Sequence, residues 1–432
     1  MSVAFTSCIV ALILLAAIGA PIALAMIASA IVYLAVKGQD LGLAAEQIIQ
    51  GLYDSFLLLA IPLFIVAANI MNAGTISDRL LNFCVALVGR FRGGLGHVNV
   101  VASMIFAGMS GSAVADAVGL GKVVIRMMIQ KGYTPAYAAA ITAASSTIGP
   151  IIPPSIPMVL YALVSDTSIG YLFLGGILPG VLMGVSLMAL NWRIAKTRDF
   201  PIETPPQFKE LPSLTLRAFP ALLMPIILLY GIYGGATTPT EAAAVAAAYA
   251  LILATVFYRA VSVRILNSVL MESSRATASV GLVIGGALIF NYIVASENIP
   301  AAVSGALQGL EMSPLAFLLA LNVLFLVLGC LLDATTIILV IVPLFVPACQ
   351  ALGIDMVHFG VVTVVNCMIG LITPPYGVLL FVINATTGIP LRAIISEIWL
   401  FIAALLAALL LMILVPDTVL WIPKLFGYVP GG

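Results

Sequence analysis

Apolar residues fill long, unbroken stretches of the chain, and polar residues gather in the short segments between them. A transmembrane barrel would need alternating segments of about ten residues, whereas these runs are continuous and far longer. Their lengths suit helices that cross a bilayer, so the pattern predicts an all-α polytopic membrane protein. The expected apolar helices lie at residues 4–36, with a break or strong tilt at Gly19–Pro21, and at 55–72, 78–93, 171–194, 218–233, 239–258, 276–295 and 395–415.

Two further regions consist of paired half-length runs followed by a proline-rich apolar segment. Residues 97–129 and 313–351 each hold two short runs around a tip, which predicts two re-entrant hairpins. The segments 135–165 and 357–384 contain the double prolines of PPS and TPP, and proline removes a backbone donor and clashes with the preceding turn. Both segments are therefore expected to be broken helices. Broken backbone is tolerated in a membrane only where protein or a water-filled cavity surrounds it, so each break is expected to hold something polar.

The two regions correspond to each other at an offset of 221 residues, as between Gly149 and Gly370. The break STIGPIIPPS (146–155) aligns without a gap with CMIGLITPPY (367–376). The same offset pairs Gly108 with Gly329, Gly132 with Gly353, Ser112 with Asp333 and Ser145 with Asn366. This gapless agreement across hairpins and breaks predicts two structural repeats.

Charge in the loops predicts the orientation of these repeats. The only clearly hydrophilic stretch, residues 193–217, holds five of the 17 Lys and Arg residues and is expected in the cytoplasm. If the hairpins do not cross the membrane, the first hairpin opens from the cytoplasm and the second from the opposite side. The loop at 259–275 carries three arginines and is expected inside, whereas 296–313 carries two glutamates and no basic residue. The repeats are therefore predicted to be inverted, with the amino terminus outside.

Composition agrees with a membrane protein and excludes several other classes. The 432 residues are 63% hydrophobic and only 8% charged, with a mean hydropathy of +1.23, which no soluble domain of this size would show. The first apolar run is too long for a signal peptide and is expected to be retained. The 17 basic and 17 acidic residues cancel, so no nucleic acid partner is implied. Scattered cysteines, distant histidines and the absence of HExxH, GxSxG and phosphate-loop motifs predict no enzyme, no organic cofactor and no transition-metal site.

Hairpins and broken helices that meet near the middle of the membrane are a recurrent design of secondary transporters. Carbonyls freed along residues 145–150 and 366–373 are hard oxygen ligands suited to a small cation such as sodium, whereas half-helix amino termini suit an anion. The hairpin tips add small residues, which allow close backbone approach, and hydroxyls, which donate or accept. These tip residues are Gly108, Ser110, Gly111 and Ser112 in the first hairpin and Gly329 and Asp333 in the second.

Acidic residues inside apolar segments are candidates for function, because a buried carboxylate is expensive in a membrane. Asp333, at the second tip, is expected to be functional, and it can also cap the helix that follows it. Asp116 follows the first tip by one turn, and a structural ion pair with nearby Lys122 or Arg126 is the favoured interpretation. Glu241, in TTPTEAAA, is expected to complete a capping pattern at a helix start.

Four stretches together resemble the large membrane subunit of tripartite ATP-independent periplasmic (TRAP) transporters: SGSAVAD (110–116), STIGPIIPPSIPMVLYA (146–162), CLLDATTIILVIVPLFVP (330–347) and GLITPPYGVLLFVIN (370–384). The resemblance covers essentially the whole chain. It implies sodium-coupled secondary transport of elevator type, in which a hairpin-and-broken-helix module moves against a fixed scaffold. It also implies two partners in the bacterial inner membrane system: a periplasmic binding protein that delivers substrate, and a small subunit of about four helices, expected on a separate chain.

The resemblance also assigns roles to individual residues. It implies about two or more bound sodium ions, one held by Gly108, Ser145 and Gly149 and a symmetry-related one by Gly329, Asn366, Gly370 and Thr373. Ser110, Ser112 and Asp333 would line a substrate pocket between them. Ser155 is a further candidate for substrate contact, although Ser155 and Thr373 could equally satisfy the broken backbone. The family handles carboxylates such as C4-dicarboxylates, sialic acids and other sugar or keto acids, and no buried arginine is found that would select one of them.

This interpretation divides the chain into scaffold and transport segments. The expected segments are scaffold helices at 1–94, the first transport segment at 95–170, scaffold helices at 171–295 with a cytoplasmic linker at 195–217, the second transport segment at 296–390, and a carboxyl-terminal scaffold helix and tail at 391–432. A divalent-anion/sodium symporter that needs no binding protein would have the same architecture and remains the main alternative. A membrane-embedded enzyme or scaffold would need paired titratable residues in the membrane. A channel is also considered, but the broken repeats suit alternating occlusion better than a continuous pore.

Overall fold

Helices account for almost all of the secondary structure in this computed structural model, which describes residues 2–73, 76–198, 200, 210–308 and 312–430. Five helical stretches of the described chain are long and apolar enough to cross a membrane: α11 (Ile169–Thr197), α12 (Leu211–Tyr233), α13 with its π turn η3 (Pro239–Phe257), α14 (Val263–Ser296) and α21 (Leu391–Leu414). A sixth would combine α3 (Gly42–Asp54) with η1 and α4 (Phe56–Asn72), which meet at a bend of 73°. The expected all-helical, multi-span architecture is confirmed.

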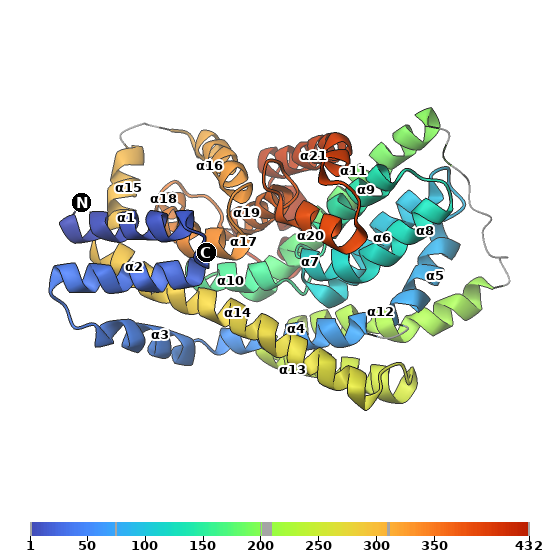
Figure 1. Cartoon of the computed structure of the whole chain (residues 1–432), viewed down its shortest axis with the longest axis horizontal. Coiled ribbons are helices and arrows are strands. Elements are labelled where there is room, and N and C mark those ends of the chain that lie inside the picture. The colour runs from blue at the N-terminus through green and yellow to red at the C-terminus, as the bar shows by residue number, and fades with distance from the viewer. Residues whose placement is uncertain (1, 74–75, 199, 201–209, 309–311, 431–432) are drawn as a thin grey trace.

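The amino-terminal apolar run folds into two helices rather than one. Helix α1 (Val3–Ala17) and helix α2 (Ile22–Lys37) lie side by side (Figure 1). The chain turns between them at Gly19, whose φ of 86° is in the region that favours glycine. The break expected at this position is therefore confirmed, and each half is too short to span a bilayer core upright.

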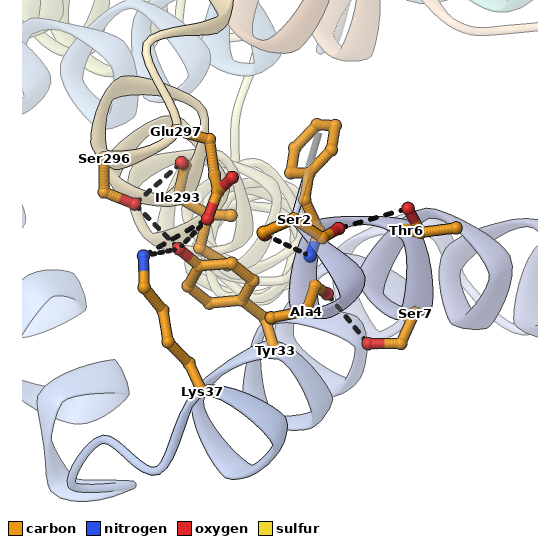
Figure 2. Close-up of polar contacts among 10 residues, drawn as sticks. Ser2, Ala4, Thr6, Ser7, Tyr33, Lys37, Ile293, Ser296 and Glu297 are labelled. Carbon is orange, nitrogen blue, oxygen red and sulfur yellow. Dashed lines mark hydrogen bonds and ion pairs between the residues drawn. The ribbon is translucent and has the colours of Figure 1, made fainter.

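A cluster of polar contacts connects these two helices to the carboxyl end of α14 (Figure 2). The Tyr33 hydroxyl donates to Glu297 Oε1 at 2.8 Å, and Lys37 forms an ion pair with the same oxygen at 3.2 Å. Hydrogen bonds from Ser2 and Tyr33, together with Lys37, lower the pKa of Glu297 to about 2. The cluster holds α2 against α14, along which α2 also packs.

The two hairpin regions contain the same succession of elements. In the first, α6 (Gly94–Ser110) leads to a tip and returns through α7 (Ala113–Asp116), the π turn η2 (Ala117–Gly121) and α8 (Lys122–Gln130). In the second, α16 (Pro314–Gly329) returns through α17 (Ala334–Thr336), the π turn η4 (Ile337–Ile341), the 3₁₀ turn η5 (Val342–Leu344) and α18 (Val346–Ala351). Each return arm therefore begins with a short α-helical turn followed by a π turn.

Each hairpin is followed by a helix that is broken where the sequence predicts it. Helix α9 (Pro135–Ser146) ends before the first double proline, and α10 (Ile156–Ser165) resumes after it. Helices α19 (Met356–Gly370) and α20 (Val378–Thr387) flank the second break in the same way. The peptide bonds Pro153–Pro154 and Pro374–Pro375 are both cis.

The two hairpin-and-break regions interlock. Helix α10 packs against α17 and η4 of the second hairpin, and α20 packs against α7 and η2 of the first. The Tyr161 hydroxyl donates to the Met356 carbonyl at 2.8 Å, which ties α10 to the start of α19. Helices α11 and α21 cover this unit through contacts with α6, α9 and α19, and α22 (Asp417–Leu425) packs on α11.

The remaining long helices form a separate layer along the lower edge of Figure 1. Helix α4 (Ala60–Asn72) packs on α13 and α14, and α5 (Ile76–Val88) packs on α12. The start of α13 carries the expected capping box, because Glu241 N donates to Thr238 Oγ1 at 3.3 Å and Thr238 N donates to Glu241 Oε2 at 2.7 Å.

Two expected loops prove to be helical. Residues 259–275 were expected to be a basic loop, but α14 already begins at Val263, so Arg264 and Arg275 belong to the helix. Polar residues end the apolar run without ending the helix, and 34 residues make a helix of about 51 Å at 1.5 Å per residue, longer than a bilayer core. Within the expected loop at 296–313, residues 299–308 form α15 (Ile299–Gln308).

Candidate functional site

The first hairpin tip lies directly against the first break. Gly111, with a φ of 59°, ends α6, and a Cβ at this position would lie 2.6 Å from the Pro154 carbonyl oxygen. A Cβ at Gly108 would lie 3.7 Å from the Pro153 carbonyl oxygen and only 2.6 Å from Pro225 Cγ of α12. Glycine is therefore required at this tip for the backbones to approach closely, as the sequence predicts.

The second tip and the second break meet even more closely. A Cβ at Gly370 would lie 2.7 Å from the Cα of Gly329 and 3.0 Å from its carbonyl oxygen. The structure thus brings together two residues, 41 positions apart, that the sequence analysis assigned to one sodium site. The backbones of the tip and the break are in direct contact here, with no side chain between them.

A buried polar network lies behind the first break and contains Ser145. The Ser103 hydroxyl donates to Ser145 Oγ at 3.0 Å, and Ser145 Oγ donates to Asn99 Oδ1 at 3.3 Å. Asn99 Nδ2 in turn donates to Thr142 Oγ1 at 2.6 Å. Sequence reasoning missed Asn99 and Ser103, although their spacing of four residues on α6 places them on one helix face and could have indicated them.

The second break has a matching network built from asparagines. Asn366 Nδ2 donates to the Asn322 carbonyl at 2.8 Å and to Asn322 Oδ1 at 2.7 Å. Asn366 Oδ1 and Thr363 Oγ1, both buried, receive no hydrogen bond from the described residues. The Thr373 hydroxyl donates to the Ile369 carbonyl at 2.7 Å, which leaves its oxygen as an acceptor. Asn322 and Thr363 were not expected from the sequence.

Ser112 and Asp333 hold equivalent places at the two tips. Ser112 Oγ accepts from Ala115 N at 3.4 Å and caps α7. Asp333 Oδ2 accepts from Thr336 N at 3.1 Å and caps α17, while the Thr336 hydroxyl donates to Asp333 Oδ1 at 2.5 Å. The capping role expected for Asp333 is therefore confirmed, and contact of either residue with substrate remains a prediction.

Ser155 and Ser110 are buried in this structure. Ser155 caps α10 by accepting from Met158 N at 3.2 Å, and its hydroxyl donates to the Pro150 carbonyl across the break. Ser155 thus satisfies broken backbone, which was one of the two roles considered for it. Ser110 lies beside the carboxylate of Asp116, one turn into the return arm of the same hairpin.

The expected ion pair of Asp116 is wrong. Asp116 is 1% exposed, no Lys or Arg of the described residues lies within ion-pair distance, and neither oxygen accepts a hydrogen bond of normal geometry although the uncharged Ser110 side chain lies beside them. Lys122 and Arg126 lie on the exposed face of α8 instead. They follow Asp116 by six and ten residues, whereas side chains meet along a helix at spacings of three and four, so these groups do not come together.

A cavity of about 390 Å³ lies away from the tips, between α14 and the second hairpin. Its lining includes Asp54, Asn291, Leu339 and Pro343, and none of the residues expected to bind substrate. Asn291 Nδ2 donates to the Leu339 carbonyl at 3.0 Å beside it. No cluster of three or more His, Cys, Asp or Glu is found within the described part of the chain, so the ligands offered at the tips are carbonyls, hydroxyls and amides.

Glycine tips packed on broken helices, inside an all-helical multi-span fold, are an arrangement typical of secondary transporters. The chain belongs to the tripartite ATP-independent periplasmic transporter family, as its DctM component: the family model matches residues 9–418. The resemblance identified from the sequence motifs is therefore confirmed.

Relatives along the full length support this membership. The large permease protein SiaM of a sialic acid TRAP transporter from Vibrio cholerae serotype O1 is 40% identical over 412 residues, which cover 95% of this chain and 96% of that protein. The C4-dicarboxylate TRAP transporter large permease protein DctM of Pseudomonas aeruginosa is 39% identical over 374 residues, 87% of this chain and 88% of that protein. The isethionate TRAP transporter permease protein DctMQ of Oleidesulfovibrio alaskensis is 37% identical over 400 residues, 92% of this chain but only 63% of that protein.

The fold is also similar to a solved transporter structure. The YdaH transporter of Alcanivorax borkumensis superimposes with a TM-score of 0.58 at 16% sequence identity, over 86% of each chain. At this identity the comparison supports the fold alone, namely an all-helical membrane protein with several spans.

Proposed function

We propose that this protein carries out sodium-coupled uptake of an organic acid that a periplasmic binding protein delivers. Membership of the TRAP family supports the transport role and the dependence on a periplasmic component. The observation that carries the sodium coupling is the close contact of each glycine tip with a broken helix, as between Gly329 and Gly370. Freed carbonyls and buried amide or hydroxyl oxygens gather there, and these are ligands suited to a small cation in secondary transporters.

The proposed sodium ligands are grouped by break. Gly108, Ser145 and Gly149 would contribute to one site, and Gly329, Asn366, Gly370 and Thr373 to the other, for about two or more sodium ions in total. Ser110, Ser112, Ser155 and Asp333 are proposed to contact the substrate between the sites. The substrate class is a C4-dicarboxylate, a sialic acid or another sugar or keto acid, in keeping with the relatives named for sialic acid and C4-dicarboxylates.

The transport movement is proposed to be an elevator built from two inverted repeats. The two hairpin-and-break regions share their succession of elements and interlock through α10 and α20, which supports movement as one unit. The scaffold against which this unit moves is proposed to consist of α1–α5, α11–α14, α21 and α22. We further propose that the protein lies in the bacterial inner membrane with a periplasmic amino terminus and with the linker at 195–217, part of which lies outside the described residues, on the cytoplasmic side.

A small membrane subunit of about four helices is the second proposed partner. The DctMQ relative supports it, since this chain matches only 63% of that longer permease protein.

The test is uptake by proteoliposomes that contain this protein and its small subunit. Labelled sialic acid and a labelled C4-dicarboxylate are offered in turn, with the cognate binding protein and an inward sodium gradient. We expect one of the two acids to be taken up, and only when the binding protein and the sodium gradient are both present. Uptake without sodium would contradict the coupling, and sodium-driven uptake without a binding protein would favour the divalent-anion symporter alternative.

Replacing Ser145 with alanine is expected to raise the sodium concentration for half-maximal uptake by about tenfold, because one hydrogen-bonded oxygen of the site is lost. The neighbouring Ser146→Ala is a matched control: its hydroxyl is equally buried but donates only to the Thr142 carbonyl, at 2.8 Å. Equal sodium dependence of the two variants, measured in the same proteoliposomes, would remove Ser145 from the site.

A further inference from the structure

Asp116 points its carboxylate at the first break. A Cβ placed on Gly149 would lie 2.3 Å from Asp116 Oδ2 and 3.3 Å from Cγ, so the carboxylate lies directly against the backbone of this glycine. The Ser110 side chain at the hairpin tip lies on it as well. Asp116 therefore lies where the tip and the return arm of the first hairpin meet the first break.

Nothing in the described part of the chain neutralises this carboxylate. Asp116 is 1% exposed, and among the described residues neither oxygen accepts a hydrogen bond of normal geometry, the Ser110 side chain beside it is uncharged, and no Lys or Arg lies within ion-pair distance. An ionised carboxylate in such a place is highly unfavourable unless a counter-charge accompanies it. In native structures a buried polar group without a partner calls for an explanation, and a bound ion is one of the recognised ones.

Backbone oxygens beside Asp116 are available to the same ion. The Thr147 and Gly149 carbonyls lie in the break and accept no hydrogen bond from the described residues. The π turn that begins after Asp116 widens the return arm at this point, and such turns recur at functional sites. One carboxylate combined with neutral oxygens gives a site of single negative charge, which suits a monovalent cation better than a divalent one.

We propose that Asp116 is the anionic ligand of the sodium ion bound at the first break. The inference rests on the proposed sodium coupling and adds the charged group that the site otherwise lacks. The second break has no equivalent, because the repeat offset places the apolar Ile337 opposite Asp116. The two sodium sites therefore differ in charge, and the first binds sodium more tightly because its ligand set carries a full negative charge.

Asp116→Asn tests the proposal, since it keeps the shape of the side chain and removes its charge. In proteoliposomes with the small subunit and binding protein, we expect the sodium concentration for half-maximal uptake to rise at least about tenfold, as when one member of a buried charge pair is removed. The sodium Hill coefficient should fall towards one. Glu241→Gln, which alters an exposed capping carboxylate, should leave both unchanged.

Thermal melting of the purified membrane complex, without substrate or binding protein, separates binding from folding. Sodium should raise the melting temperature of the wild type by several degrees relative to choline at the same concentration. The increase for Asp116→Asn should be much smaller, because only a bound ligand stabilises the folded state. In choline, Asp116→Asn should melt at the same temperature as the wild type or higher, since it lacks the unneutralised charge. A lower melting temperature there would indicate a structural role and overturn the proposal.

The outcomes distinguish this inference from the proposed function. If wild-type uptake depends on sodium and Asp116→Asn shows the same dependence, only the role of Asp116 fails. If wild-type uptake does not depend on sodium, the proposed sodium coupling and the proposed role of Asp116 are both wrong. If the variant keeps its sodium dependence but loses a pH dependence of uptake that the wild type shows, the neutralising cation is a proton, and the sodium proposal is overturned.

Discussion

Replacing Asp333 with alanine is expected to abolish substrate uptake while the protein remains folded in the membrane. Asp333 is half-buried at the second hairpin tip, where a carboxylate is expensive, and we propose that its charge serves substrate binding there. Loss of its cap on α17 costs only about 1 kcal/mol, which is too little to unfold a helix held by tertiary packing. Uptake in proteoliposomes and the melting temperature of the same preparation together measure the two effects.

Asp333→Ser separates capping from charge. Serine is the residue that caps the equivalent turn of the first hairpin at Ser112, so this variant keeps the cap and removes only the carboxylate. We expect it to be as inactive as the alanine variant and as stable as the wild type. Normal transport by Asp333→Ser would reduce Asp333 to a helix cap and remove it from the substrate site.

Replacing Gly370 with alanine is expected to eliminate uptake by forcing the second tip and break apart. The added Cβ would lie 2.7 Å from Gly329 Cα and 2.8 Å from its carbonyl carbon. Both atoms belong to backbone, which cannot rotate away as a side chain can, so the overpacking costs about 3 kcal/mol or more. The carbonyls proposed to bind the second sodium ion would be displaced together with the contact.

Gly281→Ala is the matched control for that substitution. Gly281 lies inside α14, and a Cβ there would meet no atom within 4 Å. Alanine should be tolerated or slightly stabilising at this position, because it has the higher helix propensity. Uptake and melting temperature should therefore match the wild type. If Gly370→Ala behaves like Gly281→Ala, the close tip-to-break contact is not needed for transport.

The elements that carry function were predictable because their signals are local. Proline cannot continue a helix whatever surrounds it, so Pro153 and Pro374 place both breaks within a few residues of their observed positions. Cap residues act on the three residues that follow them, which is why Asp333 could be assigned as a cap, and Glu241 as part of a capping pattern, from the sequence alone. The glycine tips were found in another way, from the offset of 221 residues that aligns Gly108 with Gly329.

Other features could not be predicted because they depend on which segments meet in space. Asn99, Ser103 and Asn322 are ordinary residues of apolar helices until α6 and α16 pack beside the broken helices and give them partners. Hydropathy located the apolar part of α14 but not its polar end at Val263, because exposed charge does not end a helix. The association of α11 and α21 with the interlocked unit likewise follows from packing.

The stretch 143–157 shows most clearly which features the sequence determines and which features depend on the tertiary structure. The sequence by itself determined that its helix breaks, that a second copy occurs 221 residues later, and that the chain is a TRAP-type membrane subunit, because backbone chemistry and motif wording are properties of consecutive residues. Only the tertiary structure decided that Asp116 faces Gly149 without a partner rather than pairing with Lys122 or Arg126. A side chain's electrostatic partner is set by the direction in which it projects from a helix and by what packs against that face, and the packing is not written in consecutive residues.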